Sequence, residues 1–272
     1  MKIAIIGSGY IGTELSMMLK KDHYITIATN TVHKMNLLEK ISQKTIILDL
    51  KDDDQIFDLL ANNDAIVITI SADKQEDFDI TYLKIAQAIK KQALLSDIKR
   101  TIIYTSSIVV YGDQQGKWVD ETASINPISN EAQILSDTEN IYLSLKEDDW
   151  KICILRLAEI YGPGHDLTMM IKELEKNIIP GKGDNFTNMI HLEDVLYSID
   201  YALNHHLEGI YNIVDDDHPT RKELYHQISQ KMHLTDVKWN PNYKIFRNTN
   251  KKVSNHKIKS AGYHFFVPSR KI

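Results

Sequence analysis

The sequence predicts an α/β protein in which helices cover both faces of a doubly wound parallel sheet. Three observations predict it: short apolar runs alternate with amphipathic segments, a glycine-rich loop follows the first run, and the 272 residues are 43% hydrophobic and 25% charged. This composition is typical of a globular protein with a sizeable core. The length suits one such sheet with a small appended lobe.

The predicted strands are short apolar runs without polar alternation, which suit strands buried on both faces of a sheet. They cover residues 2–6, 24–28, 45–48, 65–70, 101–104 and 151–155. Between them, apolar residues recur at helical spacing over 12–21, 55–60 and 80–92. Alternating strands and helices imply right-handed crossovers between parallel strands.

A glycine loop, Gly7-Ser-Gly9-Tyr-Ile-Gly12, follows the first predicted strand and opens a helix. This context predicts a site for a dinucleotide, NAD or NADP. Gly7 would take the tight turn, Gly9 would leave room for the pyrophosphate, and Gly12 would let the helix approach the strand. Amides at the helix N-terminus would meet the negative charge. The expected contacts in the loop are Gly7, Ser8, Gly9, Tyr10, Ile11 and Gly12.

The end of the second predicted strand bears on the choice of cofactor. A carboxylate there binds the ribose hydroxyls of NAD and repels the 2′-phosphate of NADP. The sequence reads Ala28-Thr-Asn-Thr31 without an acid, so NADP is favoured over NAD. Asn30 could hydrogen-bond a ribose or phosphate, and Lys34 could supply positive charge. Asp49 could accept from the adenine amine or instead cap the following helix, and Ser71 is a further expected contact.

From Gly162 onward the composition and patterning of the sequence change. Glycine and proline cluster at 161–164 and 180–183, and helical patterns return at 192–203 and 220–232. We therefore predict a dinucleotide-binding domain over residues 1–162. A smaller substrate-binding lobe over 163–272 is expected to be partly interleaved with it. Loops at the start of this lobe would lie across the carboxyl ends of the strands, where ligands bind in open α/β sheets.

Charge and apolar patterning exclude several classes of protein. A net charge of −5 argues against nucleic-acid binding, which needs a clustered basic surface. No run of 18 apolar residues occurs, and the N-terminal apolar stretch is short, so neither a membrane span nor a secretory signal is predicted. The single cysteine, Cys153, lies in an apolar run, where a buried inert thiol is expected. These features indicate a cytoplasmic protein with a small-molecule substrate.

Further motifs follow the glycine loop in a recognisable order. They are Thr105-Ser-Ser-Ile-Val-Val-Tyr-Gly112, Asp120-Glu121 with Pro127, Leu155-Arg-Leu-Ala-Glu-Ile-Tyr-Gly-Pro-Gly164, Asn188-Met-Ile-His-Leu-Glu-Asp194 and Tyr211-Asn-Ile-Val-Asp215. Together they resemble the extended short-chain dehydrogenase/reductase family, the NAD-dependent epimerase/dehydratase group, over nearly the whole chain. The run at 252–255, with Gly262 and Pro268, resembles the tail of a smaller atypical subgroup. The resemblance implies a Rossmann fold and hydride transfer.

The resemblance also implies catalytic positions. Ser107, four residues before Tyr111, would hydrogen-bond the substrate oxygen, although a polar strand end is the alternative. The family then expects a Tyr and, four residues later, a Lys that lowers the pKa of the Tyr. Aligning on Pro127 and Glu139 puts Glu131 and Leu135 at these positions, and the atypical subgroup also lacks the pair.

Tyr111 and Glu131 are the candidate substitutes for the missing acid. The alternatives are that Tyr111 packs against the strand and that Glu131 is a solvated helix residue. Two functions therefore stay open. One is an oxidoreductase or sugar-nucleotide-type epimerase that moves hydride to or from C4 of the nicotinamide. The other is a catalytically reduced regulator that senses NADP against NADPH. The motifs in the predicted substrate-binding lobe favour the first.

Other polar residues receive structural interpretations or alternatives. His191 is expected to be a structural histidine that Asp194 hydrogen-bonds. Arg156 could contact a ligand or pair with a buried acid. No metal site is predicted, because the histidines share no ligand spacing with cysteines or acids. The resemblance implies a homodimer paired through helices near 80–91 and 134–145.

Overall fold

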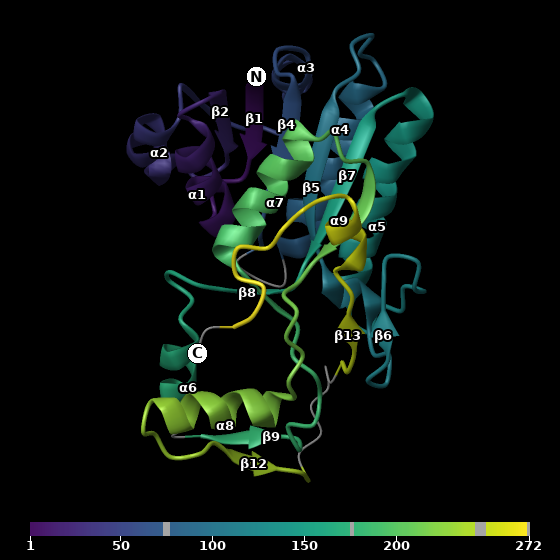
Figure 1. Cartoon of the computed structure of the whole chain (residues 1–272). Helices are drawn as coiled ribbons and strands as arrows, with labels where there is room; N and C mark the ends of the chain where they lie inside the picture. Colours follow the sequence, from purple (N-terminus) through teal and green to yellow (C-terminus); the bar gives the residue numbers. More distant parts are fainter. Residues whose placement is uncertain (73–76, 175–176, 243–248, 271–272) are drawn as a thin grey trace. The chain divides into compact units, whose positions relative to one another are not determined.

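The computed structural model describes residues 1–72, 77–174, 177–242 and 249–270, and it divides the chain into two compact units (Figure 1). Unit 1 comprises Met1–Ser107, Asn130–Arg156 and Leu196–Tyr211. Unit 2 comprises Ile108–Ser129, Leu157–Val195 and Asn212–Ile272. Each unit is thus built from three segments, whereas the sequence predicted one boundary at residue 162 with partial interleaving.

The central sheet has seven strands in the order β11-β7-β5-β4-β1-β2-β3. Every pairing among β1 to β5 is parallel. The chain reverses its direction of winding between β1 and β4, and the carboxyl ends of these strands border a crevice at such a reversal. The predicted doubly wound α/β sheet is confirmed. The strands are β1 (Lys2–Ile6), β2 (Tyr24–Thr29), β3 (Lys44–Ile47), β4 (Ala65–Ile68), β5 (Thr101–Ser107), β7 (Lys151–Leu157) and β11 (Gly209–Ile213).

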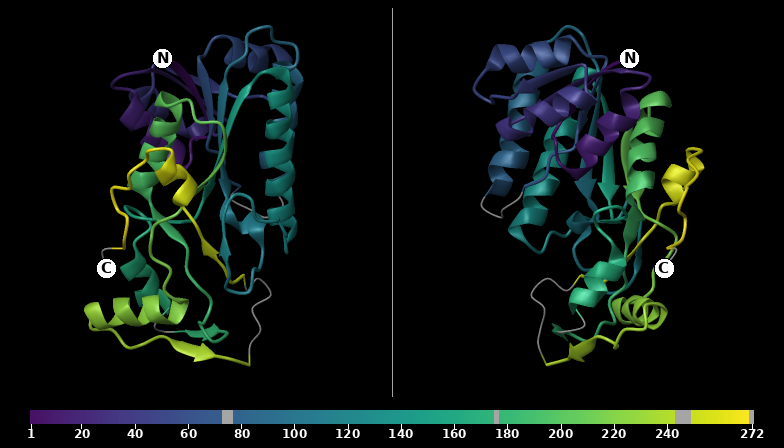
Figure 2. Two further views of the ribbon diagram at one scale, coloured as in Figure 1. Left: turned by 45° about the vertical axis from the view of Figure 1, so that its right-hand side comes forward. Right: turned by 90° about the vertical axis from the view of Figure 1, so that its left-hand side faces the viewer.

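Helices cover both faces of this sheet (Figures 1 and 2). One face carries α1 (Tyr10–Leu19), α2 (Met35–Ile41) and the part of α7 (Leu192–Asn204) that belongs to unit 1. The other carries α3 (Asp53–Ala61), α4 (Ile85–Ala93) and α5 (Asn130–Ser144), which contact one another in series. The single helix expected over 80–92 is instead a π-helical segment, Asp79–Lys84, that runs into α4.

Unit 2 packs small elements around its own apolar core. Its helices are α6 (Leu167–Leu174), α8 (Arg221–Lys231) and α9 (His256–Ser260). Three short strand pairs accompany them: β8 (Glu159–Tyr161) with β10 (Met189–His191), β9 (Ile178–Pro180) with β12 (Lys238–Asn240), and β6 (Trp118–Val119) with β13 (Lys252–Val253). The core residues are Tyr161, Ile171, Ile179, Met189, Leu224, Tyr225, Ile228 and Val237. In the described ranges, no helix is both long and apolar enough to cross a membrane.

Candidate functional site

The glycine loop turns from β1 into α1, and two of its glycines are required by the chain itself. Gly7 has φ +116°, a conformation that L side chains avoid, and a Cβ there would lie 2.8 Å from the carbonyl carbon of Thr69. A Cβ on Gly12 would lie 2.0 Å from the carbonyl oxygen of Gly7. Gly12 therefore permits the close approach of α1 to the end of β1.

Gly9 differs from the other two glycines of the loop. Its φ is −77°, which any residue adopts, and the nearest atom to an added Cβ is Ser71 Oγ at 3.3 Å. Its backbone and its surroundings would accept a small side chain. The absence of a side chain at Gly9 thus keeps open the space beside the loop, as a pyrophosphate requires.

A cavity of about 340 Å³ lies against this loop, within unit 1. Its lining consists of the loop, the end of β2, the residues after β3 and after β4, and the segment from Asp77 to Ile85. Of the predicted contacts, five line it: Gly7, Ser8, Gly9, Asn30 and Ser71. Tyr10, Ile11 and Gly12 lie in the first turn of α1 and are not part of this lining.

The first turn of α1 offers a site for an anion at the cavity. Gly9 is the N-cap residue, and no side chain caps the helix. Amides in the first turn of an α-helix lack intrahelical partners, and the helix dipole is positive there. An anionic group such as a pyrophosphate fits this position.

Thr29 at the end of β2, and Lys34 a few residues later, form hydrogen bonds with the glycine loop. Ser8 Oγ and Thr29 Oγ1 are 2.7 Å apart, and Lys34 Nζ donates to the Ser8 carbonyl at 3.0 Å. Among the described residues that line the cavity, the charged ones are Lys34 and Asp77. The carboxylate that would select NAD is absent from the end of β2, and a lysine reaches the cavity instead.

Asp49 lies after β3 and is exposed. Its carboxylate accepts from the Lys51 amide at 2.9 Å, and its own amide donates to Gln55 Oε1 at 2.8 Å. The cap of α3 is Asp52, whose carboxylate accepts from the Gln55 amide at 2.9 Å. The capping alternative for Asp49 is therefore wrong. Its neighbours Leu48 and Leu50 line the cavity, and Asp49 does not.

The three predicted catalytic residues have different environments. Ser107 ends β5 and is partly exposed. Tyr111 is 0% exposed, and its hydroxyl donates to Asn212 Oδ1 at 2.8 Å. This burial favours the packing alternative for Tyr111 over a role as a proton donor.

Glu131 and Leu135, which the sequence alignment puts at the positions of the expected Tyr and Lys, both lie on α5. Glu131 is 8% exposed and Leu135 is 6% exposed, so both are buried. The alternative that Glu131 is a solvated residue is wrong. A carboxyl group in the first turn of a helix is also stabilised as an anion by the helix dipole.

Arg156 forms an ion pair with Glu139 inside unit 1. Its Nε and Nη2 donate to the two carboxylate oxygens of Glu139 at 3.0 and 2.7 Å, and both residues are 1% exposed. Ser106 Oγ donates to Glu139 Oε1 at 2.6 Å. The network joins α5 to β5 and β7. Of the two alternatives for Arg156, contact with a ligand or pairing with a buried acid, the structure supports the pairing.

His191 and Asp194 are not hydrogen-bond partners, contrary to the expectation from the sequence. His191 Nδ1 accepts from the Glu193 amide at 3.3 Å, and its ring meets the Tyr161 ring edge-on at 5.2 Å between centroids. Asp194 is 0% exposed and accepts from the amides of Phe266 and Val267 at 2.7 and 2.9 Å. It holds the C-terminal segment in place through contacts that are distant in sequence, which residue spacing does not reveal.

With this geometry in view, the comparisons with known proteins identify the family. Residues 3–214 match the NAD dependent epimerase/dehydratase family. The chain belongs to this family. Protein YeeZ of Escherichia coli strain K12 is 33% identical over 243 residues, which cover 86% of this chain and 84% of YeeZ.

Solved structures share the fold at low sequence identity. The UDP-glucose 4-epimerase of Thermus thermophilus, in complex with NAD, is 17% identical with a TM-score of 0.79, covering 97% of this chain and 94% of that one. The UDP-glucuronic acid 4-epimerase of Bacillus cereus, in complex with UDP-glucuronic acid and NAD, is 20% identical with a TM-score of 0.78, covering 96% and 92%. A functionally unknown protein from Silicibacter pomeroyi is 20% identical with a TM-score of 0.76, covering 98% and 94%. They support the Rossmann-like architecture.

Proposed function

We propose that this protein binds NADP(H) at the glycine loop and catalyses hydride transfer to or from a carbonyl or hydroxyl carbon of a small molecule. The observation that carries the proposal is the cavity beside Gly9, where an open loop and the uncapped N-terminus of α1 form a cradle for a pyrophosphate. A nicotinamide cofactor bound there would supply the hydride donor or acceptor. Membership of the NAD dependent epimerase/dehydratase family supports the same reaction class.

The preference for NADP rests on the end of β2. Thr29, Asn30 and Thr31 offer no carboxylate to repel a 2′-phosphate. Lys34 lines the cavity, and its ammonium group already lies at hydrogen-bond distance from the loop. A 2′-phosphate would give this cation an anionic partner.

The substrate-handling residues of the proposal are Ser107 and Glu131. Ser107 would hold the substrate oxygen, and Glu131 would exchange the proton that the absent tyrosine handles in the family. Tyr111 is left out because its hydroxyl is buried and bonded to Asn212. Two of the solved structures named above, from Thermus thermophilus and Bacillus cereus, are 4-epimerases of UDP-glucose and UDP-glucuronic acid, so sugar nucleotides are the first substrates to assay.

A second candidate function is a redox sensor that binds NADP and NADPH without turnover. The observation that favours it is the burial of Leu135 on α5, at the position where the sequence alignment expects the Lys. Without that ammonium group, no positive charge at this position of α5 lowers the pKa of a proton donor.

Turnover assays separate the two functions. The purified chain is incubated with each of NAD, NADH, NADP and NADPH and with UDP-glucose or UDP-glucuronic acid, and products are followed by nicotinamide absorbance and by chromatography. We expect NADP-dependent turnover that falls by about 10²-fold or more in Glu131→Gln with cofactor affinity unchanged. Binding that distinguishes NADP from NADPH without any turnover would favour the sensor instead. Full activity in both Ser107→Ala and Glu131→Gln would contradict the roles assigned to these residues.

A further inference from the structure

Unit 2 carries an exposed tryptophan, Trp118 of β6. The residue is 58% exposed, whereas Trp150 is 2% exposed and Trp239 is partly buried. Tryptophan is highly buried on average, and its large ring is enriched where a protein binds another molecule. The groups that surround Trp118 therefore indicate what its open ring binds.

Lys252 of β13 lies opposite Trp118 in the parallel pair of β6 and β13 (Figure 1). Its ammonium group is 5.1 Å from the centre of the Trp118 ring and 4.8 Å from the centre of the Phe186 ring. The face of an aromatic ring attracts a cation because the electron density of the ring is concentrated there. The two rings therefore hold the ammonium group at the end of a long side chain in one position.

Lys252 supplies the charge of this cluster. Among the residues that the structure describes, no carboxylate forms an ion pair with it, and Asp216, which like Lys252 lies near His218, pairs with Lys259. The His218 ring meets the Trp118 ring edge-on, with 4.9 Å between centroids. Burial lowers the pKa of His218, so its imidazole is uncharged at neutral pH. The ammonium group of Lys252 is thus the cation that an anionic ligand meets here.

Asn250 connects the segments that carry these side chains. Its carbonyl accepts from the amides of Gln114 and Gly116 at 3.0 and 2.9 Å, and its Oδ1 accepts from the Phe186 amide at 3.0 Å. Gly116 has φ +77°, and a Cβ there would lie 3.4 Å from the Phe186 ring, so the turn before β6 packs directly against this ring. Trp118, Phe186 and Lys252, which we call the platform, are therefore fixed by the fold of unit 2.

An open aromatic ring beside a fixed cation is complementary to a planar ring that carries negative charge. Nucleotides combine the two, because the base stacks on an aromatic side chain and the phosphate pairs with a lysine. Stacking accepts every base, since each has an aromatic face. The net charge of −5 argues against a long nucleic acid as the ligand. A single nucleotide group therefore fits the platform best.

We propose that the platform binds the nucleotide half of the substrate, with the base stacked on the Trp118 indole and the diphosphate paired with the Lys252 ammonium group. Phe186 keeps Lys252 in place from its other side. All three residues belong to unit 2, and none of them lines the cavity at the glycine loop. The inference rests on the proposed function in taking a sugar nucleotide for the substrate.

The test separates the base from the charge. UDP, uridine and inorganic pyrophosphate are each titrated by calorimetry into the full chain without a dinucleotide. UDP offers both groups, uridine only the base, and pyrophosphate only the charge. We expect UDP to bind with a Kd on the order of 100 μM, and the other two probes to bind at least about tenfold more weakly.

Two variants assign the binding to the platform. Trp118→Leu should weaken the binding of UDP and of uridine about tenfold, because both stack on the indole. Lys252→Met keeps an unbranched apolar side chain beside the rings, so it should weaken UDP about tenfold and leave uridine unchanged. The matched controls are Phe266→Leu, at an aromatic residue of unit 2 that is 56% exposed, and the exposed Lys117→Met. Both controls should bind UDP like the parent.

Gly9→Asp distinguishes the platform from the glycine loop, because it blocks the loop and should bind UDP as tightly as the parent. The proposal is overturned if UDP does not bind, if Gly9→Asp abolishes its binding, or if Trp118→Leu or Lys252→Met binds it like the parent. Because the titration involves neither a dinucleotide nor turnover, the two proposals fail separately. UDP binding at the platform without any turnover of UDP-glucose would contradict the proposed function and leave this inference standing.

Discussion

Lys251 is a buried cation whose charge costs folding free energy. It is 3% exposed, and its Nζ donates to the Gly112 carbonyl at 3.0 Å. Burial lowers the pKa of Lys251 to about 8. A lysine in the unfolded chain titrates near 10.4, so between these pH values the unfolded state binds more protons than the folded state. The contribution of Lys251 to stability therefore rises with pH in this window.

Replacement of this lysine should change how stability depends on pH. We expect Lys251→Met to remove a slope of up to about 1.4 kcal/mol per pH unit above pH 8, because the buried charge is gone. Urea unfolding of parent and variant, at pH values on both sides of 8, measures the difference. The exposed Lys117→Met serves as control. Equal pH slopes for parent and Lys251→Met would show that Lys251 is not neutralised by burial.

At the scale of elements, the close packing of α1 against β1 requires that residue 12 has no side chain. A Cβ on Gly12 would lie 2.0 Å from the Gly7 carbonyl oxygen, so Gly12→Ala must push α1 away from the strand. We expect a loss of about 1–3 kcal/mol in the free energy of unfolding, as for other overpacked sites. Gly9→Ala meets only a side-chain oxygen, at 3.3 Å, and should unfold like the parent. Equal urea midpoints for the two variants would contradict this account of the junction.

The long elements of unit 1 could be predicted from the sequence because burial on two faces leaves a continuous apolar run. β1 has the predicted bounds, and all four residues of β4 are buried. β11 escaped prediction, since its first two residues are only partly buried and its five include Gly209 and Asn212. α2 is seven residues long with two buried, too short to show a helical period. The two- and three-residue strands of unit 2 carry no periodic signal at all.

The candidate site was predictable where a motif fixes local geometry and not where partners are distant in sequence. The glycine loop specifies its own turn, so the five predicted residues at the cavity could be found from its spacing and from the following strands. The hydroxyl of Tyr111 is bonded to Asn212, and the carboxylate of Asp194 to the amides of Phe266 and Val267. These partners are distant in sequence and come together only in the folded chain.

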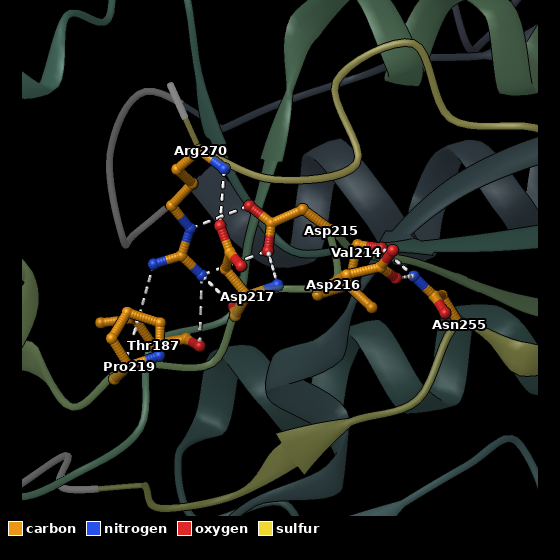
Figure 3. A network of polar contacts seen from close by, with 8 residues as sticks. All are labelled: Thr187, Val214, Asp215, Asp216, Asp217, Pro219, Asn255 and Arg270. Atoms are coloured by element: carbon orange, nitrogen blue, oxygen red, sulfur yellow. Dashed lines mark hydrogen bonds and ion pairs between the residues drawn. The ribbon is translucent and has the colours of Figure 1, made fainter. Parts of the chain in front are cut away.

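At the scale of the whole molecule, one ion pair fastens the end of the described chain to unit 2. The side chains of Arg270 and Asp215 are 2% and 0% exposed (Figure 3). Even with Arg270 present, burial raises the pKa of Asp215 to about 6. Removal of the guanidinium would leave this acid buried without its charged partner.

Substitution at this ion pair should therefore be strongly non-additive. We expect Arg270→Met to lower the free energy of unfolding by about 3 kcal/mol, because one partner of a buried pair is lost. Arg270→Met combined with Asp215→Leu should recover most of that loss, since no charge remains to be buried. Urea unfolding measures both. A double variant that is no more stable than Arg270→Met would contradict this coupling between the two side chains.

The central claim is that the cavity at the glycine loop holds a dinucleotide. The most direct measurement is calorimetric titration of the purified chain with NAD, NADH, NADP and NADPH, repeated with Gly9→Asp and Lys34→Ala. We expect NADP or NADPH to bind tightest, with a Kd on the order of 1 μM. Gly9→Asp should abolish binding without unfolding the protein, because its backbone accepts a side chain. Lys34→Ala should cost NADP about tenfold in affinity and leave NAD unchanged. Absence of binding for all four dinucleotides, or equal binding by Gly9→Asp, would contradict the claim.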